Sequence, residues 1–372
     1  MYSRLRLINF KSHRDSTLEL SPLTALVGPN NSGKTSVLRA LEVFEQLLRA
    51  PTIGHVCVGR LAPALLARYG TNEYSIDAHT QETTVLFTGI SPHRHGSWWL
   101  DNKRIEGSPT RGLYNHIAAQ SFAPAGYFKF SATALARPSY SPEEHPVLGQ
   151  DGYGLATLID YLKGYAPEQF EQLNDAIHEV IPSVQRVRTG RQKLDLEIPV
   201  NQAQKQYFNY PIAPVSVIGN ALILDMVGAP NLPAHAVSEG TLLVLGILTL
   251  MLSPNGPEVL LLDDIGQGLH PYAQQKLIPA LRRVLDLNPK LQIIFTTHSP
   301  NIIDEMKPHE VQVVAADSEG VSHVRCLSEH PNVERALEVL TTGEFLGAEG
   351  ESWVIEADPH SGGSDAADGG VG

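Results

Sequence analysis

Two glycines, Gly28 and Gly33, stand five residues apart, and Lys34 and Thr35 follow the second, which matches the pattern G-x-x-x-x-G-K-[ST]. In such a loop the glycines let successive backbone N–H groups point at a phosphate. The lysine reaches the β and γ oxygens, and the threonine hydroxyl takes a magnesium position. The stretch LTALV before the loop predicts a strand, and the pattern after it predicts a helix. This context favours a phosphate-binding loop over an ordinary glycine-rich turn.

Two carboxylates, Asp263 and Asp264, end the stretch VLLLDD. Its four aliphatic residues predict a buried central strand, and the end of such a strand lies beside the phosphate-binding loop in folds of this kind. We expect Asp263 to hold magnesium through water and Asp264 to orient or deprotonate an attacking water. A strand that merely ends in polar residues is the alternative.

A histidine and a capped helix complete the set of candidate residues. His298 ends the apolar stretch LQIIFTTH, where it can hydrogen-bond a γ-phosphate or have a structural role. Ser238 stands at the expected N-cap of the helix in VSEGTLLVLGILTLML, and Gly240 allows close approach of a backbone or a phosphate. The simplest geometry has this helix end face the nucleotide of a second subunit. An ordinary capped core helix is the alternative.

The elements that must position these residues follow two patterns. Short antiparallel strands are predicted between about 74 and 104, and a further strand at 126–132. Helices are predicted at 154–165 and 167–182, and two strands in VQRVRTG and KLDLEIPV. After about 220, apolar strands alternate with helices: ALILDMV, the helix after Ser238, VLLLDD, PYAQQKLIPALRRVLDL and LQIIFTTH. That alternation indicates a parallel sheet covered on both faces.

Composition sets limits on the protein's class. The chain has 372 residues, 42% of them hydrophobic, which is enough for two or three structural units. Its formal net charge of −12 disfavours nucleic-acid binding through the average field, so any DNA contact would need a local basic patch. The distant Cys57 and Cys326 fit a reducing cytoplasm, and the N-terminus lacks the apolar core of a signal peptide. The longest apolar run, at 241–252, is too short to span a bilayer and predicts a buried helix.

Taken in order, these pieces resemble the ABC-type ATPases, and more narrowly the RecF-like and SMC-like branch that includes the OLD ATPases. The resemblance rests on NFKSHRDSTLELSPLTALVGPNNSGKTSVLRALEVF, SEGT, LLLDD with GLHP, TTHSPNIID and LTTGEFLGAEGESWV. It implies an α/β P-loop NTPase fold, the ABC ATPase head. This fold has a mainly parallel core sheet, an antiparallel side sheet and an inserted α/β lid subdomain.

The resemblance also implies the cofactors, ATP and Mg²⁺, and the roles of the candidate residues. The implied magnesium ligands are Thr35 and Asp263. The implied catalytic residues are Asp264 and His298, the switch histidine. The residues expected to bind ATP are Gly28, Asn30, Asn31, Ser32, Gly33, Lys34, Thr35 and Ser36, with Ser238, Glu239 and Gly240 acting on a second subunit's γ-phosphate. Lys11, Ser12 and His13 occupy the place where such proteins approach the nucleotide, and Gln120 and Gln150 are candidates for the glutamine loop.

The chain departs from the family pattern from the second strand carboxylate onward. Asp264-Ile265-Gly266 stands where Glu-Pro-Glu is usual, so the presumed base is shorter by one carbon–carbon bond, about 1.5 Å. A displacement near 1 Å can cost about a hundredfold in rate, which predicts slow ATP turnover and a long-lived ATP-bound dimer.

We expect five segments. They are an N-terminal lobe (1–130), an inserted lid (131–219), a C-terminal lobe (220–330), a helical extension (331–357) and a disordered tail (358–372). Residues 60–220 contain no heptad run, so we expect no long coiled coil there. The residues after 330 contain no carboxylate cluster, so we expect no TOPRIM nuclease domain of the kind found in OLD nucleases. His93 and His95 fit a solvated loop, and Trp98 and Trp99 fit packing in the antiparallel sheet.

The favoured function is a cytoplasmic ATPase with no membrane segment. It would form a homodimer around ATP and control DNA or a separate effector protein, in DNA repair or phage defence. The alternative is a nucleotide-gated scaffold in which ATP binding, rather than hydrolysis, assembles a complex. A small-molecule kinase is disfavoured, because the helix at Ser238 and the switch histidine have no role in that chemistry.

Overall fold

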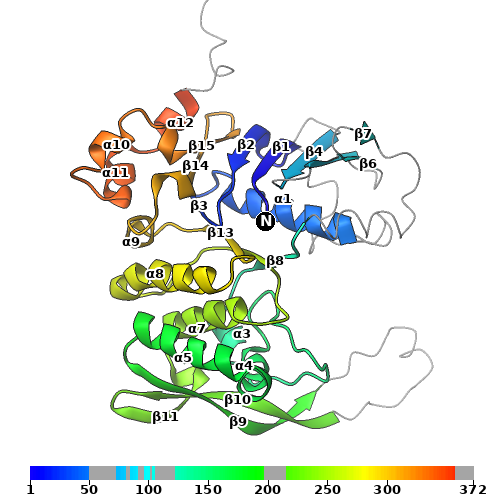
Figure 1. Cartoon of the computed structure of the whole chain (residues 1–372), viewed down its shortest axis with the longest axis vertical. Coiled ribbons are helices and arrows are strands. Elements are labelled where there is room, and N and C mark those ends of the chain that lie inside the picture. The colour runs from blue at the N-terminus through cyan, green and yellow to red at the C-terminus, as the bar shows by residue number, and fades with distance from the viewer. Residues whose placement is uncertain are drawn as a thin grey trace, which may run out of the picture. The chain divides into compact units, whose positions relative to one another are not determined.

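The computed structural model describes residues 1–49, 73–80, 84–90, 96–100, 103–104, 122–196 and 215–356. The chain divides into two compact units, whose helices and strands are labelled in Figure 1. The first comprises Met1–Tyr127, Glu258–Ile265 and Lys290–Gly372, and the second Phe128–Pro257 and Gly266–Pro289. Cys57, His93, His95, Gln120 and the tail predicted at 358–372 lie outside the described residues.

Twelve described strands form one sheet, in the order β7-β6-β5-β4-β1-β2-β15-β14-β3-β13-β12-β8. Their bounds are β1 (Arg4–Phe10), β2 (His13–Glu19), β3 (Leu23–Val27), β4 (Glu73–His79), β5 (Thr84–Ile90), β6 (Gly96–Leu100), β7 (Lys103–Arg104), β8 (Ala125–Phe128), β12 (Val259–Leu262), β13 (Gln292–Thr296), β14 (Val311–Ala316) and β15 (Ser322–Cys326). Strands β14, β3, β13 and β12 pair in parallel, whereas β1, β2, β4, β5, β6 and β7 pair antiparallel. The predicted α/β fold, with a parallel core and an antiparallel side, is confirmed.

Burial explains the two parts of this sheet. Every residue of β3, β12 and β13 is buried, as expected for parallel strands covered on both faces. Strand β1 alternates, with Leu5 and Leu7 buried between more exposed polar neighbours, because only one of its faces packs on the core.

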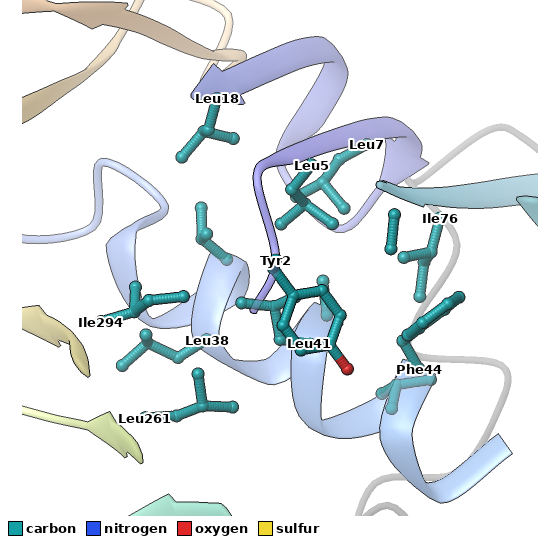
Figure 2. Close-up of a cluster of buried hydrophobic side chains, with 14 of the residues drawn as sticks. Tyr2, Leu5, Leu7, Leu18, Leu38, Leu41, Phe44, Ile76, Leu261 and Ile294 are labelled. Atoms are coloured by element: carbon teal, nitrogen blue, oxygen red, sulfur yellow. The ribbon is translucent and has the colours of Figure 1, made fainter. Parts of the chain in front are cut away.

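Helix α1 (Lys34–Arg49) is the centre of the first unit's core. Figure 2 shows Leu38, Leu41 and Phe44 on this helix. The same cluster contains Leu5 and Leu7 of β1 and Ile76 of β4, together with Leu261 of β12 and Ile294 of β13. The helix that follows the glycine loop is therefore anchored to the strands that carry the other candidate residues.

The remaining elements of the first unit follow β13. They are α9 (Pro300–Ile303), η4 (Pro308–Glu310), η5 (Leu327–Glu329), α10 (Val333–Ala336), α11 (Thr342–Glu349) and α12 (Ser352–Glu356). Helix α12 packs against β14 and β15. The helical stretch predicted after residue 330 is thus present as three short helices in the described part of the chain.

The second unit places helices on an antiparallel sheet of β11 (Ala229–Pro233), β10 (Val215–Met226) and β9 (Val184–Leu196). The helices are α3 (Ala132–Ala136), α4 (Leu155–Tyr165), α5 (Pro167–Val180), α7 (Glu239–Met251) and α8 (Pro271–Leu287), with η3 (Ala234–Ala236) before α7. As Figure 1 shows, α4 and α5 lie against β9 and β10, and α7 and α8 pack with α5.

Two predictions for this unit are wrong. ALILDMV does not belong to the parallel pattern, because β10 pairs antiparallel with β9 over its whole length. VQRVRTG and KLDLEIPV are not two strands, because β9 runs continuously through Gly190 and Arg191. The five-segment division stays a prediction, although its boundary between 219 and 220 falls inside β10.

Helix α7 is the buried helix predicted from the longest apolar run. Almost all of its residues are buried, and Gly246 lies against Phe130 and Leu135, where a side chain on residue 246 would collide. None of the described helices is both long and apolar enough to cross a membrane.

Candidate nucleotide-binding site

The glycine loop connects β3 to α1, and its backbone leaves room for no other residue at two positions. Gly28 has φ +141°, and a Cβ there would lie 2.0 Å from the carbonyl oxygen of Val314. Gly33 has φ +110°, and a Cβ there would lie 2.4 Å from Oγ of Ser322 and 2.9 Å from Nε2 of His13. Since both the conformation and the space exclude a side chain, the predicted need for glycine is physically explained.

The lysine of the loop is folded back onto the loop itself. Nζ of Lys34 donates to the carbonyl oxygens of Gly28, at 2.9 Å, and Pro29, at 2.6 Å. Burial lowers the pKa of Lys34, while the carboxylates of Asp263, Asp264 and Glu351 raise it. An ammonium group held inside this ring of backbone is placed for an anion that enters the loop.

The other loop residues differ in exposure. Asn30 and Asn31 are exposed, and Asn31 has the left-handed φ of 64° that asparagine tolerates. The N–H of Ser36 donates to the Gly33 carbonyl at 2.9 Å, in the first turn of α1. Oγ of Ser32 is buried and has no hydrogen-bond partner among the described residues. A buried hydroxyl without a partner is costly unless a ligand supplies one.

Asp263 collects three hydroxyl groups. Its Oδ1 accepts from Oγ1 of Thr35 at 3.1 Å and from Oγ1 of Thr296 at 2.8 Å. Its Oδ2 accepts from the phenol of Tyr127 at 2.9 Å. The structure therefore brings the two predicted magnesium ligands, Thr35 and Asp263, into direct contact. Carboxylate and hydroxyl oxygens are the donors that Mg²⁺ prefers.

Asp264 lies next in the chain with an unusual backbone. Its φ is 63°, in the left-handed region that aspartate enters more readily than most side chains. Its N–H donates to Oγ1 of Thr296 at 2.7 Å, so one threonine hydroxyl contacts both carboxylate residues. The Asp264 side chain is half-buried.

His298 follows β13 and is exposed. Partial desolvation of the ring lowers the pKa of His298, and the charge of Lys34 lowers it further, while Asp264 and Asp263 act in the opposite direction. These electrostatic interactions place the imidazole in the field of the loop lysine and both carboxylates.

The hairpin between β1 and β2 contacts the glycine loop through His13. His13 is fully buried, its Nε2 lies 3.2 Å from the carbonyl oxygen of Gly33, and its Nδ1 lies 2.9 Å from Oγ of Ser16. Oγ of Ser322 donates to the Ser32 carbonyl at 2.6 Å and to Oγ of Ser12 at 2.7 Å. Lys11, in the hairpin turn, has φ 51°, and burial lowers the pKa of its ammonium group.

The predicted signature residues lie in the second unit, at the start of α7. Ser238 is the N-cap, and its Oγ accepts from the N–H of Thr241. Ser238 and Glu239 are exposed, whereas Gly240 is buried. A Cβ on Gly240 would lie 2.7 Å from the carbonyl oxygen of Gly268, so the close approach that this glycine permits is to backbone. Of the two approaches expected at Gly240, by backbone or by phosphate, the structure shows the approach by backbone.

Sequence reasoning missed three residues of the site: Tyr127, Thr296 and Ser322. Thr296 alone had a local signal, as a polar residue between an apolar strand and His298. Of the glutamine-loop candidates, Gln150 accepts the N–H of Lys129 through its backbone carbonyl in the second unit. Trp98 and Trp99 lie in β6, in the predicted antiparallel sheet.

The arrangement fits ATP and Mg²⁺. A Cβ at either of two positions would fill the loop, and the buried hydroxyl of Ser32 has no partner in the part of the chain that the structure describes. Thr35 and Asp263 offer hard oxygen donors side by side. No group of three or more histidine, cysteine or acidic side chains suited to a metal occurs among the residues that the structure describes. One or two protein oxygens with water and phosphate completing the shell is the usual magnesium arrangement in nucleotide sites.

A comparison with protein families decides the relationship. The family model described as "AAA domain, putative AbiEii toxin, Type IV TA system" matches residues 23–304. The chain belongs to this family. The matched stretch of the AAA domain contains the glycine loop, both strand carboxylates, His298 and the start of α7.

Two curated relatives match shorter stretches of this AAA-domain chain. The Septu protein PtuA of Bacillus thuringiensis is 34% identical over 88 residues, which cover 24% of this chain and 21% of the relative. An OLD nuclease of Thermus scotoductus is 51% identical over 43 residues, which cover 12% of this chain and 8% of the relative. The chain therefore spans only 21% and 8% of the lengths of these relatives.

Solved structures establish the fold. An SMC head bound to the C-winged helix domain of ScpA matches with a TM-score of 0.58 and 17% identity, covering 91% of this chain and 99% of that one. An SMC head with an extended coiled coil, bound to the C-terminal domain of ScpA derived from Pyrococcus furiosus, matches with a TM-score of 0.56 and 14% identity, again covering 91% and 99%. The predicted resemblance to ABC-type ATPases of the RecF-, SMC- and OLD-like kind is confirmed as a resemblance, and the family to which the chain belongs is that of the AAA domain.

Proposed function

We propose that this chain binds MgATP at the loop of its first unit, hydrolyses it slowly, and pairs with a second copy around the nucleotide. The AAA/ABC-type ATPase domain supports nucleotide use in general. The observation that carries the specific proposal is the contact between Thr35 and Asp263 beside the glycine loop. Residues separated by 228 positions meet at the place where a phosphate-bound magnesium ion needs oxygen ligands.

The chain's own residues divide the work on the nucleotide. Lys34 would exchange the carbonyl oxygens of Gly28 and Pro29 for phosphate oxygens, while Thr35 and Asp263 would hold the metal. Bound Mg²⁺ supplies charge neutralisation on the phosphate oxygens. Asp264 would orient or deprotonate the attacking water, and His298 would respond to the γ-phosphate.

Pairing is proposed from the exposed end of α7. Ser238 and Glu239 are exposed there, and the first N–H groups of a 13-residue helix carry positive partial charge. A second copy's α7 would close over the nucleotide held by the first copy's loop. The glycine loop and Asp263 belong to the first unit, and the start of α7 belongs to the second. Every chain therefore carries both of the parts that the proposed pairing requires.

The output of pairing is proposed to be control of DNA or of a separate effector protein, in the cytoplasm. The match to an OLD nuclease, whose name states action on nucleic acid, supports a DNA-linked role, and the resemblance to the OLD ATPases underlies the proposal of DNA repair or phage defence.

The test is the molar mass in solution with and without a non-hydrolysable ATP analogue and Mg²⁺. Wild type is expected to double in mass with nucleotide, whereas Lys34→Ala is expected to stay single because it cannot bind the phosphates. Ser238→Arg is expected to bind nucleotide as a single chain, and Ser183→Arg, at an exposed serine before β9, to pair like wild type. A wild-type chain that binds nucleotide yet keeps its mass would contradict pairing.

A nucleotide-gated scaffold is the second candidate, and the backbone of Asp264 favours it. Asp264 has a short side chain and a left-handed backbone with φ 63°, and both would make its carboxylate inefficient at orienting or deprotonating the attacking water. Asp264→Ala separates the two candidates: loss of biological output supports the hydrolysis-driven mechanism, and retention supports the scaffold.

A further inference from the structure

Tyr127 is a buried tyrosine in β8 whose phenol is directed at Asp263. Its exposed fraction is 3%, and its O–H donates to Oδ2 of Asp263 at 2.9 Å. The two threonine hydroxyls both reach the other oxygen, Oδ1. The phenol therefore holds the oxygen that the two threonines do not reach, and it helps to fix the rotation of the carboxylate about its Cβ–Cγ bond.

The phenol ring is itself fixed by the loop helix. The guanidinium carbon of Arg39, on α1, lies 3.6 Å from the centre of the Tyr127 ring. Nη1 of Arg39 pairs with Oε2 of Glu42 at 2.6 Å, which keeps the guanidinium over the ring. A stacked cation of this kind holds an aromatic ring both by electrostatic attraction and by contact area. Helix α1 thus positions Asp263 a second time, independently of Thr35.

The state of the phenol suits a donor. A phenol keeps its proton at neutral pH, so the O–H of Tyr127 is available to donate to the carboxylate that it contacts. A hydrogen bond from a hydroxyl to a carboxylate is among the stronger kinds in proteins.

We propose that Tyr127, stacked under Arg39, is a positioning residue that holds Oδ2 of Asp263 in the orientation needed for Mg²⁺. This inference rests on the proposed MgATP site. Groups that hold a metal ligand in place typically change metal affinity by about 10- to 100-fold when they are removed. The role differs from packing alone, because its effect is confined to the metal-bound form of the nucleotide.

The test compares binding of a non-hydrolysable ATP analogue, by calorimetry, in Mg²⁺ and in EDTA. Tyr127→Phe keeps the ring and its stacking but removes the hydroxyl. It is expected to weaken binding in Mg²⁺ by about tenfold while leaving binding in EDTA unchanged, since one charge-assisted hydrogen bond is lost. Arg39→Lys, which loses the planar stack, is expected to shift Mg²⁺-dependent binding in the same direction by a smaller factor.

Two controls separate positioning from general effects. Tyr74→Phe removes the hydroxyl of another buried tyrosine, on β4, and is expected to bind like wild type in both conditions. In an Asp263→Asn background, adding Tyr127→Phe is expected to cost less than it does in wild type, because the two side chains act as a unit.

The outcomes distinguish this inference from the proposed function. If wild type does not bind the analogue in Mg²⁺, the proposed MgATP site is wrong. If wild type binds and Tyr127→Phe binds equally well in Mg²⁺, or loses affinity equally in Mg²⁺ and EDTA, the positioning role is wrong while the site stands.

Discussion

The starts of α1 and α7 are both helix N-termini that present backbone N–H groups, yet they are held very differently. The loop before α1 is fixed from outside, by the Val314 carbonyl against Gly28 and by His13 and Ser322 against Gly33. The start of α7 is capped by its own first turn, through Ser238 and Thr241.

The loop before α1 is therefore preorganised, whereas the start of α7 is accessible at the surface. A rigid cradle fixes the position of a phosphate before it binds, which lowers the cost of binding. The start of α7 is capped within its own first turn, but Ser238 and Glu239 remain exposed to a surface that approaches. In the proposed function, the loop before α1 would hold the phosphate and the start of α7 would contact the nucleotide of a second copy.

The largest expected effect concerns the loop before α1. In Gly28→Ala the new Cβ meets the Val314 carbonyl oxygen at 2.0 Å and the backbone sits at φ +141°, so the loop must move. We expect MgATP binding to fall by more than about a hundredfold, since a misplaced loop loses several hydrogen bonds to phosphate at once. Calorimetry measures this. Gly347→Ala, at a helical glycine with open space, is the control and should bind normally.

A second variant changes the chemistry beside this loop. Asp264→Glu lengthens the carboxylate arm by about 1.5 Å, so steady-state ATP hydrolysis should rise by up to about a hundredfold if reach limits the rate. Because the residue is left-handed, with φ 63°, stability should fall by about 1 kcal/mol. Turnover equal to that of wild type would show that arm length is not limiting. Asp264→Asn supplies the uncharged reference.

The pH dependence of stability tests the support beneath the loop. Burial lowers the pKa of His13 from 6.5 to about 4. The unfolded chain therefore binds more protons between these values, and the stability that depends on neutral His13 is present above pH 6.5 and lost as pH falls toward 4.

From pH 7 to pH 5 this residue should remove about 2 kcal/mol from the free energy of unfolding, measured by urea denaturation. In His13→Asn that part of the pH dependence should vanish. His309→Asn, at an exposed histidine of the same unit, should keep it. An unchanged pH dependence in His13→Asn would contradict the assignment.

The smallest expected effect concerns the start of α7. In Gly240→Ala the Cβ approaches the Gly268 carbonyl oxygen at 2.7 Å, so the backbone at this position must shift. Nucleotide binding by single chains should be unchanged, because the glycine loop is not altered. Pairing should weaken by about tenfold, which corresponds to about 1.4 kcal/mol, because the start of α7 is displaced. Sedimentation at several concentrations measures pairing. Gly164→Ala, with nothing near its Cβ, should pair normally.

What the sequence predicted correctly was local in the chain. The glycine loop, the strand before Asp263 and the cap at Ser238 each depend on neighbours within a few residues, and strong periodicity marked their elements. Tyr127 escaped notice because its partner Asp263 is 136 positions away. Ser322 contacts Ser12 and Ser32 from a distance of 310 and 290 positions.

The misread strand β10 has a similar cause. Its apolar residues Leu222 and Leu224 are buried and alternate with partly exposed ones, as in any half-buried strand. Direction within a sheet is decided by the partner, here β9, and a single strand does not carry that information.

The hydroxyl of Thr296 accepts from the N–H of one acidic residue and donates to the carboxylate of the other. The residue proposed to hold the metal and the residue proposed to orient water therefore share one hydrogen-bond partner, so a displacement of either is expected to move the other. Substitutions at Asp263, Asp264 and Thr296 should accordingly be non-additive, and evolution would have to alter the three as one unit.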